Sequence, residues 1–163
     1  MEMLELIFGN GTFWAVLGAS MAAMLAGIGS AIGVGICGEA AAGLISEEPE
    51  KFGQTLVLQA LPGTQGIYGL LIAFIIMLKI GVIGTPVDIT LYQGLYLFAA
   101  AQPIAWCGLG SAIAQGKASA AGVGTIAKRP EEFAKAMIYP AMVETYAILS
   151  LLVSFLMVNG LKL

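Results

Sequence analysis

Hydrophobic positions in this chain form long runs that are almost free of charge, instead of alternating with polar positions. Residues 6–38, 52–78 and 89–116 contain no charged side chain, and residues 136–161 contain only one. Each run exceeds the roughly 20 residues that an α-helix needs to cross a bilayer. The pattern therefore predicts four transmembrane helices.

Short polar segments separate these runs. They are residues 46–51 (SEEPEK), residues 79–88 (KIGVIGTPVD) and residues 127–132 (AKRPEE). Glycine, proline and clustered charges are typical of turns. We therefore expect an all-α membrane protein with two tandem helical hairpins, the first over residues 1–80 and the second over residues 81–163.

The two predicted hairpins are copies of each other. The segment Gly27–Ile32 (GIGSAI) recurs 81 residues later as Gly108–Ile113 (GLGSAI), and Pro49–Phe52 (PEKF) recurs as Pro130–Phe133 (PEEF). A repeat with an even number of crossings keeps its orientation, so these copies are parallel. Inverted repeats are typical of alternating-access transporters. Parallel two-helix repeats instead favour a ring or array.

Composition supports the membrane assignment and adds a packing expectation. Only 10% of the residues are charged, whereas soluble domains have roughly 25%. The net charge of −3 and the lack of a basic block make nucleic acid an unexpected partner. Glycine and alanine crowd the first and third runs, which allows helix backbones to approach closely in a membrane. We expect these helices to form an inner ring and the bulkier second and fourth helices an outer layer.

The distribution of basic residues predicts an orientation. Five of the seven basic residues lie on or toward the side of the two tight loops, namely Lys51, Lys117, Lys128, Arg129 and Lys135. Positive charge marks the cytoplasmic side of membrane proteins. The tight loops are therefore expected in the cytoplasm, and both termini on the other side of the cell membrane.

Glu144 is the single charge of the fourth run. A carboxylate inside a membrane helix costs several kcal/mol and usually marks a path for ions or protons. Counted from the tight loops at about 1.5 Å per residue, Glu144 lies roughly 18 Å deep, Gln65 roughly 21 Å and Gln115 roughly 20 Å. Three polar side chains from three helices are thus predicted at one level.

The second run adds oxygen atoms at this depth. Four of its residues share one helical face: Leu61, Thr64, Gln65 and Tyr68. Pro62 has no N–H, so the carbonyl of Leu58 loses its helical partner and nearby carbonyls can turn toward a ligand. Hard cations prefer oxygen ligands, and this set predicts a cage for a small monovalent cation. A proton site would need only the carboxylate of Glu144.

Each of these residues also has a purely structural interpretation. Glutamine and threonine often form hydrogen bonds between membrane helices, and Tyr68 could serve packing alone. Glu144 could be a structural hydrogen-bond partner. The shared depth of the three polar side chains, within duplicated hairpins that have no competing cluster, favours the ion site.

These segments resemble the membrane rotor-ring subunit, or proteolipid, of V-type ATPases, in particular subunit K of bacterial sodium-translocating enzymes. The resemblance runs from Phe13 to Phe155. It is most specific at Leu61–Gly69 (LPGTQGIYG), Ala114–Lys117 (AQGK) and Met142–Ala147 (MVETYA). The pairing of Pro62 with Gln65 is a feature that sodium rings show and that proton rings generally lack.

The resemblance implies a set of ion ligands. Na⁺ would be bound by the Glu144 carboxylate, by the side chains of Thr64, Gln65 and Gln115, and by the backbone carbonyl of Leu61. Tyr68 would hydrogen-bond the carboxylate and help to lock the site. Na⁺ would be the transported ion, with Li⁺ expected to substitute for it and H⁺ to compete.

The resemblance also implies partners. Identical copies would form a membrane ring in contact with lipids and with a stator membrane subunit that carries an essential arginine. A central-stalk subunit would contact the cytoplasmic loops. The chain has no nucleotide-binding G-x-x-x-x-G-K-[ST] motif, so it is expected to be a non-catalytic subunit.

Three other functions remain open at this point. The first is a proton-translocating rotor ring in which Gln65 and Thr64 serve only as hydrogen-bonding groups. The second is a small four-helix drug/proton antiporter, although a substrate pocket would need an aromatic lining. The third is a purely structural channel, which the lone carboxylate at the oxygen cluster disfavours.

Two further charges need partners. Lys117 lies two residues from Gln115, so it should point to a nearly opposite face at nearly the same depth. Glu39 lies within about one helical turn of that level on the first helix. One hypothesis is a Glu39–Lys117 ion pair between the inner helices. The alternative is that Lys117 extends toward the cytoplasmic edge of the membrane.

Overall fold

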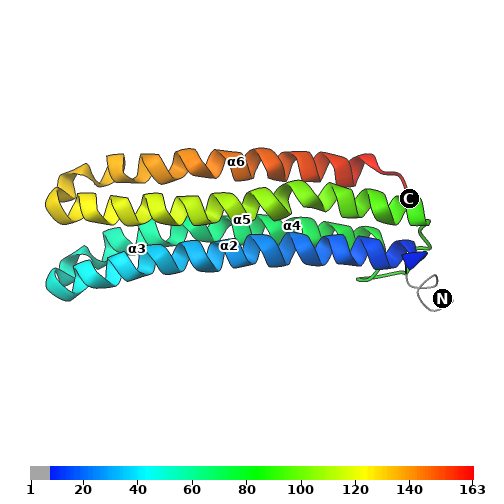
Figure 1. Cartoon of the computed structure of the whole chain (residues 1–163), viewed down its shortest axis with the longest axis horizontal. Coiled ribbons are helices and arrows are strands. Elements are labelled where there is room, and N and C mark those ends of the chain that lie inside the picture. Colours follow the sequence, from blue (N-terminus) through cyan, green and yellow to red (C-terminus); the bar gives the residue numbers. More distant parts are fainter. Residues whose placement is uncertain (1–7) are drawn as a thin grey trace.

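The computed structural model describes residues 8–163, in which four long helical segments lie side by side (Figure 1). The elements are α2 (Gly11–Glu47), η1 (Pro49–Lys51), α3 (Phe52–Ala60), η2 (Leu61–Gly63), α4 (Thr64–Lys79), α5 (Leu91–Lys128), η3 (Pro130–Glu132) and α6 (Phe133–Gly160). Helix α2 begins and α6 ends at the same end of the bundle, and the tight loops lie at the opposite end.

The all-α architecture predicted from the sequence is confirmed. Four segments are long and apolar enough to cross a membrane, namely Gly11–Glu47, Pro49–Lys79, Leu91–Lys128 and Pro130–Gly160. Helices α2 and α5 nevertheless run well past their charge-free runs, which end at residues 38 and 116. Charged side chains do not end a helix, so the charge pattern underestimates the length of both helices.

Proline sets the tight-loop ends of α2 and α5. Glu48 precedes Pro49 and has φ −130° and ψ 75°, and Arg129 precedes Pro130 with φ −143° and ψ 80°. The proline ring clashes with a helical conformation of the preceding residue. Both long helices therefore stop at equivalent positions of the repeat.

Side-chain caps and one glycine set the opposite ends. The Asn10 side chain accepts hydrogen bonds from the first backbone N–H groups of α2, and Thr90 and Gln93 form a reciprocal capping box at the start of α5. Gly81 has φ +73°, and a Cβ atom there would lie on the carbonyl of Thr85. This turn between the hairpins therefore requires glycine.

Helices α2 and α5 are in backbone contact. A Cβ atom built on Gly116 would overlap the carbonyl oxygen of Gly33, and one built on Gly29 would lie 2.6 Å from the Cα of Leu109. Small residues allow such contact in membrane proteins. Helix α4 packs on α2, and α6 packs on α5, so each hairpin adds one bulkier helix to this pair.

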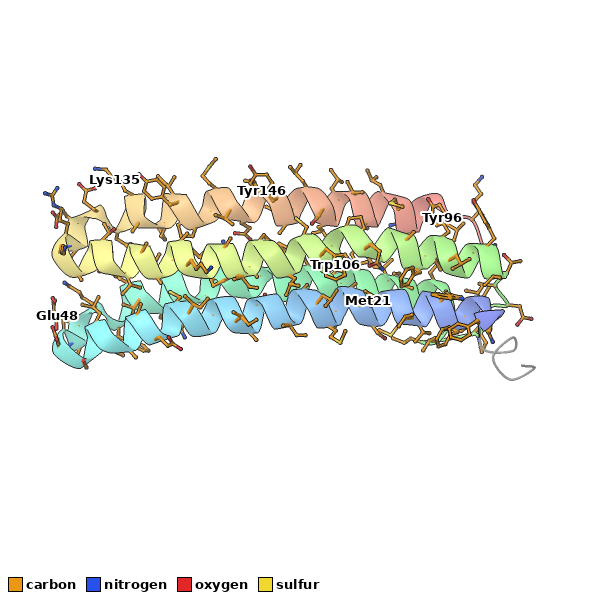
Figure 2. The ribbon with its side chains drawn as sticks, viewed as in Figure 1. Met21, Glu48, Tyr96, Trp106, Lys135 and Tyr146 are labelled. Atoms are coloured by element: carbon orange, nitrogen blue, oxygen red, sulfur yellow. The ribbon has the colours of Figure 1, made fainter. Side chains whose placement is uncertain are left out.

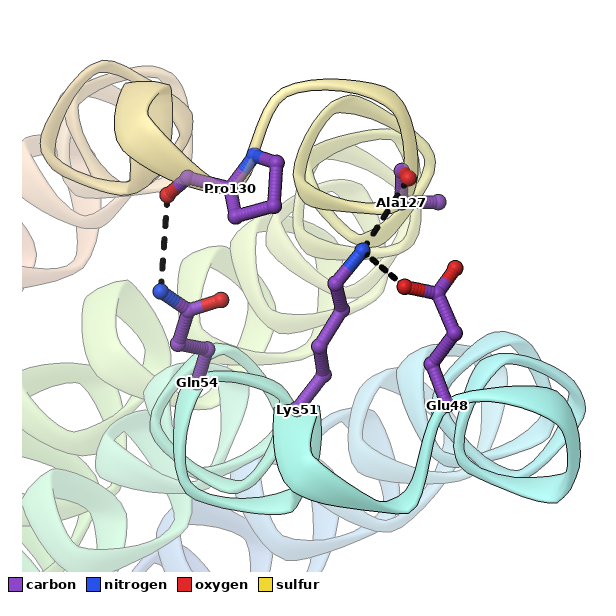
Figure 3. A network of polar contacts seen from close by, with 5 residues as sticks. All are labelled: Glu48, Lys51, Gln54, Ala127 and Pro130. Atoms are coloured by element: carbon purple, nitrogen blue, oxygen red, sulfur yellow. Dashed lines mark hydrogen bonds and ion pairs between the residues drawn. The ribbon is translucent and has the colours of Figure 1, made fainter.

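The two tight loops are joined by polar contacts (Figure 3). The buried Lys51 ammonium pairs with Glu48 and donates to the carbonyl oxygen of Ala127 at 3.1 Å. Gln54 donates to the carbonyl oxygen of Pro130 at 3.4 Å. These contacts connect the first loop to the end of α5 and to the second loop, and so hold the two hairpins in axial register.

Candidate ion-binding site

The second transmembrane segment is interrupted at Pro62, as its sequence predicts. The short helix η2 separates α3 from α4, and Pro62 is buried at its centre. The backbone N–H of Gly66 donates to the hydroxyl of Ser30 on α2, at 2.8 Å. The Thr64 hydroxyl donates to the carbonyl oxygen of Leu61, at 3.1 Å. The break thus gathers a carbonyl and a hydroxyl in place of regular helical pairing.

A chain of hydrogen bonds leads from this break to the carboxylate. Thr64 Oγ1 lies 3.4 Å from Gln65 Oε1, and Gln65 Nε2 donates to Gln115 Oε1. Gln115 Nε2 in turn lies 3.4 Å from Glu144 Oε2. Tyr68 donates its hydroxyl proton to the other carboxylate oxygen, Glu144 Oε1, at 2.7 Å. The structure therefore brings together side chains from α4, α5 and α6 that the sequence placed at one depth.

Burial differs across this group. Gln65 and Gln115 have no exposed surface, whereas Tyr68 and Glu144 are only partly buried. The two amides therefore form the interior of the site, and the carboxylate lies at its edge. Hydrogen bonds to a charged group each contribute about 1.5–3 kcal/mol. The two donors facing Glu144 thus offset part of the cost of a carboxylate at this depth.

Two contacts of the site were not anticipated from the sequence. Gln115 Nε2 also donates to the carbonyl oxygen of Pro140, at 3.1 Å, which fixes the orientation of the amide beside Glu144. Ser30 stabilises the helix break from α2. Pro140 was visible in the sequence as a proline one helical turn before Glu144. Ser30 gave no signal, because it is one serine among many small residues.

The atoms gathered here are of the kind that hard cations prefer. The carbonyl of Leu61, the hydroxyl of Thr64, the amide oxygens of Gln65 and Gln115, and the carboxylate of Glu144 are all oxygen ligands. Within residues 8–163, no group of three or more His, Cys, Asp or Glu side chains could hold a metal ion. A site with a single carboxylate matches the charge of a monovalent cation.

The charges at Glu39 and Lys117 lie outside this site. Both side chains are exposed, and Lys117 points away from the fully buried Gln115, as their spacing predicts. Among the described residues, ion pairs join Lys51 to Glu48 and Lys135 to Glu132 only. The Glu39–Lys117 pair is therefore not formed within residues 8–163 of one chain.

Comparison with known proteins identifies relatives over most of the chain. The family model of the ATP synthase C subunit matches residues 17–76 and again residues 98–157. V-type sodium ATPase subunit K of Enterococcus hirae is 53% identical over 91% of this chain and 92% of its own length. A-type ATP synthase subunit K of Methanocaldococcus jannaschii is 41% identical over 88% of this chain and 61% of its own length.

A more distant relative extends the comparison to animals. The 16 kDa proteolipid of the human V-type proton ATPase is 27% identical over 90% of this chain and 91% of its own length. Together, the four apolar helices, the two matches of the family model and these relatives show that the chain belongs to the ATP synthase C-subunit family.

Proposed function

We propose that this chain is the Na⁺-carrying rotor subunit of a V-type rotary ATPase. Identical copies form a ring in the membrane, and ATP hydrolysis in a soluble head turns that ring. The observation that carries the proposal is the position of Glu144, at the end of a hydrogen-bond chain that starts from a break in a membrane helix. The sodium ATPase subunit of Enterococcus hirae, at 53% identity, supports the choice of ion.

The proposed ligands are those at the helix break and along this chain. Na⁺ is bound by the Leu61 carbonyl and by the side chains of Thr64, Gln65, Gln115 and Glu144. The amide N–H groups that now face oxygen atoms turn away when the cation enters, which requires only a rotation of each carboxamide. Li⁺ satisfies the same oxygen atoms, and H⁺ competes by neutralising the carboxylate.

Tyr68 serves as the lock of this site. Its hydroxyl holds Glu144 Oε1, an oxygen that the two amides do not contact. This bond keeps the carboxylate turned toward the interior while an ion is bound. Because Glu144 remains partly exposed, a stator group can still reach it from the side of the bundle.

The rotary mechanism assigns roles to other parts of the chain. An arginine of the stator membrane subunit displaces Na⁺ from Glu144 as each copy passes, and another ion loads as the ring turns. The tight loops lie in the cytoplasm and contact the central stalk, and the exposed apolar side chains of α4 and α6 contact lipid. Both termini lie on the other side of the cell membrane.

The repeat has a consequence for coupling. With a two-residue length change after the tight loop, Gln65 occupies in the first hairpin the place that Glu144 occupies in the second. The four helices then carry one ionisable site for the transported ion. Fewer ions then cross per turn than in a ring of two-helix subunits, and each ion receives a larger share of the free energy of ATP hydrolysis.

Carbodiimide labelling of the purified protein tests this proposal. The reagent modifies a protonated, accessible carboxyl group, and Glu144→Gln controls for labelling elsewhere. We expect millimolar Na⁺, but not K⁺, to protect Glu144, and protection to weaken from pH 9 to pH 5 as protons compete with Na⁺. Labelling that ignores Na⁺ at every pH would instead establish Glu144 as a proton carrier, and failure to form a ring would favour the antiporter.

A further inference from the structure

The internal repeat indicates how one copy of this chain meets the next. The family model matches residues 17–76 and residues 98–157. From Gly27 to Phe52, through the first tight loop, the repeated segments recur at a constant offset of 81 residues. In a ring, α5 of one copy would lie beside α2 of the next copy. The contact of α2 with α5 inside one chain is therefore the template for the contact between copies.

The residues that this template places between copies are uncovered in the single chain. The contact of Gly29 with Leu109 corresponds to Gly110 against Ile28 of the next copy. A Cβ atom built on Gly110 would meet nothing within 4 Å, and Ile28 is 46% exposed. Both positions therefore have space for a helix of the next copy to approach as closely as α2 and α5 do within one chain.

A second contact, nearer the tight loops, also places uncovered residues between copies. The backbone contact of Gly33 with Gly116 corresponds to Ala114 against Gly35 of the next copy. Gly35 has nothing within 4 Å of a built Cβ atom, and Ala114 is exposed. The open glycines Gly35 and Gly110 thus correspond to Gly116 and Gly29, which are already in backbone contact within the chain.

The same correspondence brings two opposite charges together. Lys117 and Glu39 of the next copy are the counterparts of Ile36 and Ala120 within one chain. Ile36 follows Gly33 by three residues, and Ala120 follows Gly116 by four, so each lies one turn beyond the in-chain contact of the two glycines. Lys117 and Glu39 are therefore one turn beyond the corresponding contact between copies.

The directions of the two side chains agree with a pair between copies. At about 100° per residue, Glu39 lies about 120° around α2 from the face that Gly33 turns to α5. By the same measure, Lys117 lies about 100° around α5 from Gly116. Each charge points away from the partner helix of its own chain, which explains why the pair is not formed within residues 8–163.

The first turn of α6 shows a similar complementarity. The in-chain hydrogen bond from Gln54 to the carbonyl of Pro130 corresponds to Lys135 near Pro49 of the next copy. Pro49 lies between two glutamates, Glu48 and Glu50, at the tight-loop end where Lys135 also lies (Figure 2). The second hairpin therefore presents lysines where the next copy presents glutamates.

We propose that Lys117 of each copy forms an ion pair with Glu39 of the next copy, and that this pair sets the axial register of the ring. The inference rests on the ring assembly of the proposed function. Glycine-lined helix faces are smooth and can pack at several offsets along the axis. Misaligning the copies would leave both charges unpaired near the membrane, which is costly, so one offset is strongly favoured.

Cysteine cross-linking tests the pair in the assembled protein. In a background with Cys37→Ala and Cys107→Ser, the double variant Glu39→Cys/Lys117→Cys is oxidised after purification and run on a denaturing gel. We expect a ladder of covalent oligomers, because each disulfide would join neighbouring copies. Neither single variant should give a ladder, since each supplies only one side of the pair.

The matched control is the counterpart pair inside the chain. Oxidation of Ile36→Cys/Ala120→Cys should join α2 to α5 within one polypeptide and leave only a monomer band. If the Glu39→Cys/Lys117→Cys chains assemble but remain monomeric on the denaturing gel, the inter-copy pair is wrong. If the parent chain itself does not assemble, the proposed ring fails instead, and native electrophoresis of the parent distinguishes the two results.

Discussion

At the scale of single residues, the site is organised around one carboxylate held from two directions. Tyr68 binds one oxygen of Glu144 at 2.7 Å, and Gln115 faces the other at 3.4 Å. Gln115 is held in turn by Pro140 and Gln65. A partly buried carboxylate is therefore fixed in one orientation, and no cationic side chain among residues 8–163 is paired with it.

Removing the tyrosine hydroxyl should weaken ion binding. Tyr68→Phe deletes a hydrogen bond to a charged group, which is worth about 1.5–3 kcal/mol. We therefore expect the Na⁺ affinity to fall by about tenfold or more. The Na⁺ concentration that half-protects Glu144 from carbodiimide measures this change.

The control for this substitution lies on α6. Tyr146 is 65% exposed and points away from the other helices (Figure 2). Tyr146→Phe should leave half-protection unchanged. An unchanged Na⁺ dependence in Tyr68→Phe would show that the tyrosine serves packing only, which is the other role that its sequence allowed.

Counting residues from the tight loops was enough to place Glu144, Gln65 and Gln115 at one level, because rise per residue in a helix is nearly constant. The same count gave no indication of Ser30. Its partner, Gly66, lies 36 residues away and donates through its backbone, which has no sequence signature. Contacts of this type depend on how two helices are rotated against each other.

At the scale of elements, the important feature is the interrupted second helix. Pro62 removes one backbone donor, and η2 replaces a regular turn between α3 and α4. The N–H of Gly66 is satisfied by Ser30 from α2, so a neighbouring helix completes the break. In a membrane, an interruption of this kind is tolerated only where such partners exist.

Loss of this partner should destabilise the break. Ser30→Ala leaves the Gly66 N–H without its acceptor, which costs about 1–3 kcal/mol for a buried group. We expect a lower temperature of thermal unfolding in detergent and weaker Na⁺ protection of Glu144, because Leu61 and Thr64 lie in the same turn. Circular dichroism and the labelling assay measure the two effects.

Ser20 on the same helix provides the comparison. Its hydroxyl donates to the carbonyl of Val16 within α2 and is exposed. Ser20→Ala should change neither the unfolding temperature nor the Na⁺ dependence. Equal effects of the two alanine substitutions would mean that Ser30 has no special role in the break.

At the scale of the whole molecule, the hairpins are joined through the backbones of α2 and α5. The family model matches once in each predicted hairpin, at residues 17–76 and 98–157. The boundary between residues 80 and 81 stays a prediction. Contacts of Lys51 and Gln54 with the second hairpin add polar connections at the tight-loop end.

Adding a methyl group at this interface should destabilise the bundle. A Cβ atom at Gly33 would overlap the carbonyl oxygen of Ala112, so Gly33→Ala must separate α2 from α5. Overpacking of this kind typically costs about 1–3 kcal/mol. We expect a lower unfolding temperature and less assembled oligomer on native electrophoresis.

The control for this substitution is Gly124 on α5, which has nothing within 4 Å of a built Cβ atom. Its counterpart in the repeat, Gly43, is equally open, so the next copy would not cover Gly124 either. Gly124→Ala should therefore keep or slightly raise stability, since alanine favours a helix by about 1 kcal/mol over glycine. A loss equal to that of Gly33→Ala would contradict the role of close backbone contact.

The sequence by itself determined the number of crossings, the duplication and the depth of the polar residues. These features follow from hydrophobic length, from repetition at a constant offset and from the constant rise of a helix. Pro62 likewise predicted the break in the second helix, because proline always removes a backbone donor.

Only the tertiary structure decided which groups around Glu144 touch each other. The bond from Tyr68 to Glu144, the contact of Gln115 with Pro140 and the support from Ser30 all depend on the rotation and separation of the helices. Those quantities are set by backbone contacts such as Gly33 against Gly116, to which residues far apart in the chain contribute together. For the same reason, the structure rather than the sequence excluded a Glu39–Lys117 pair within the described part of one chain.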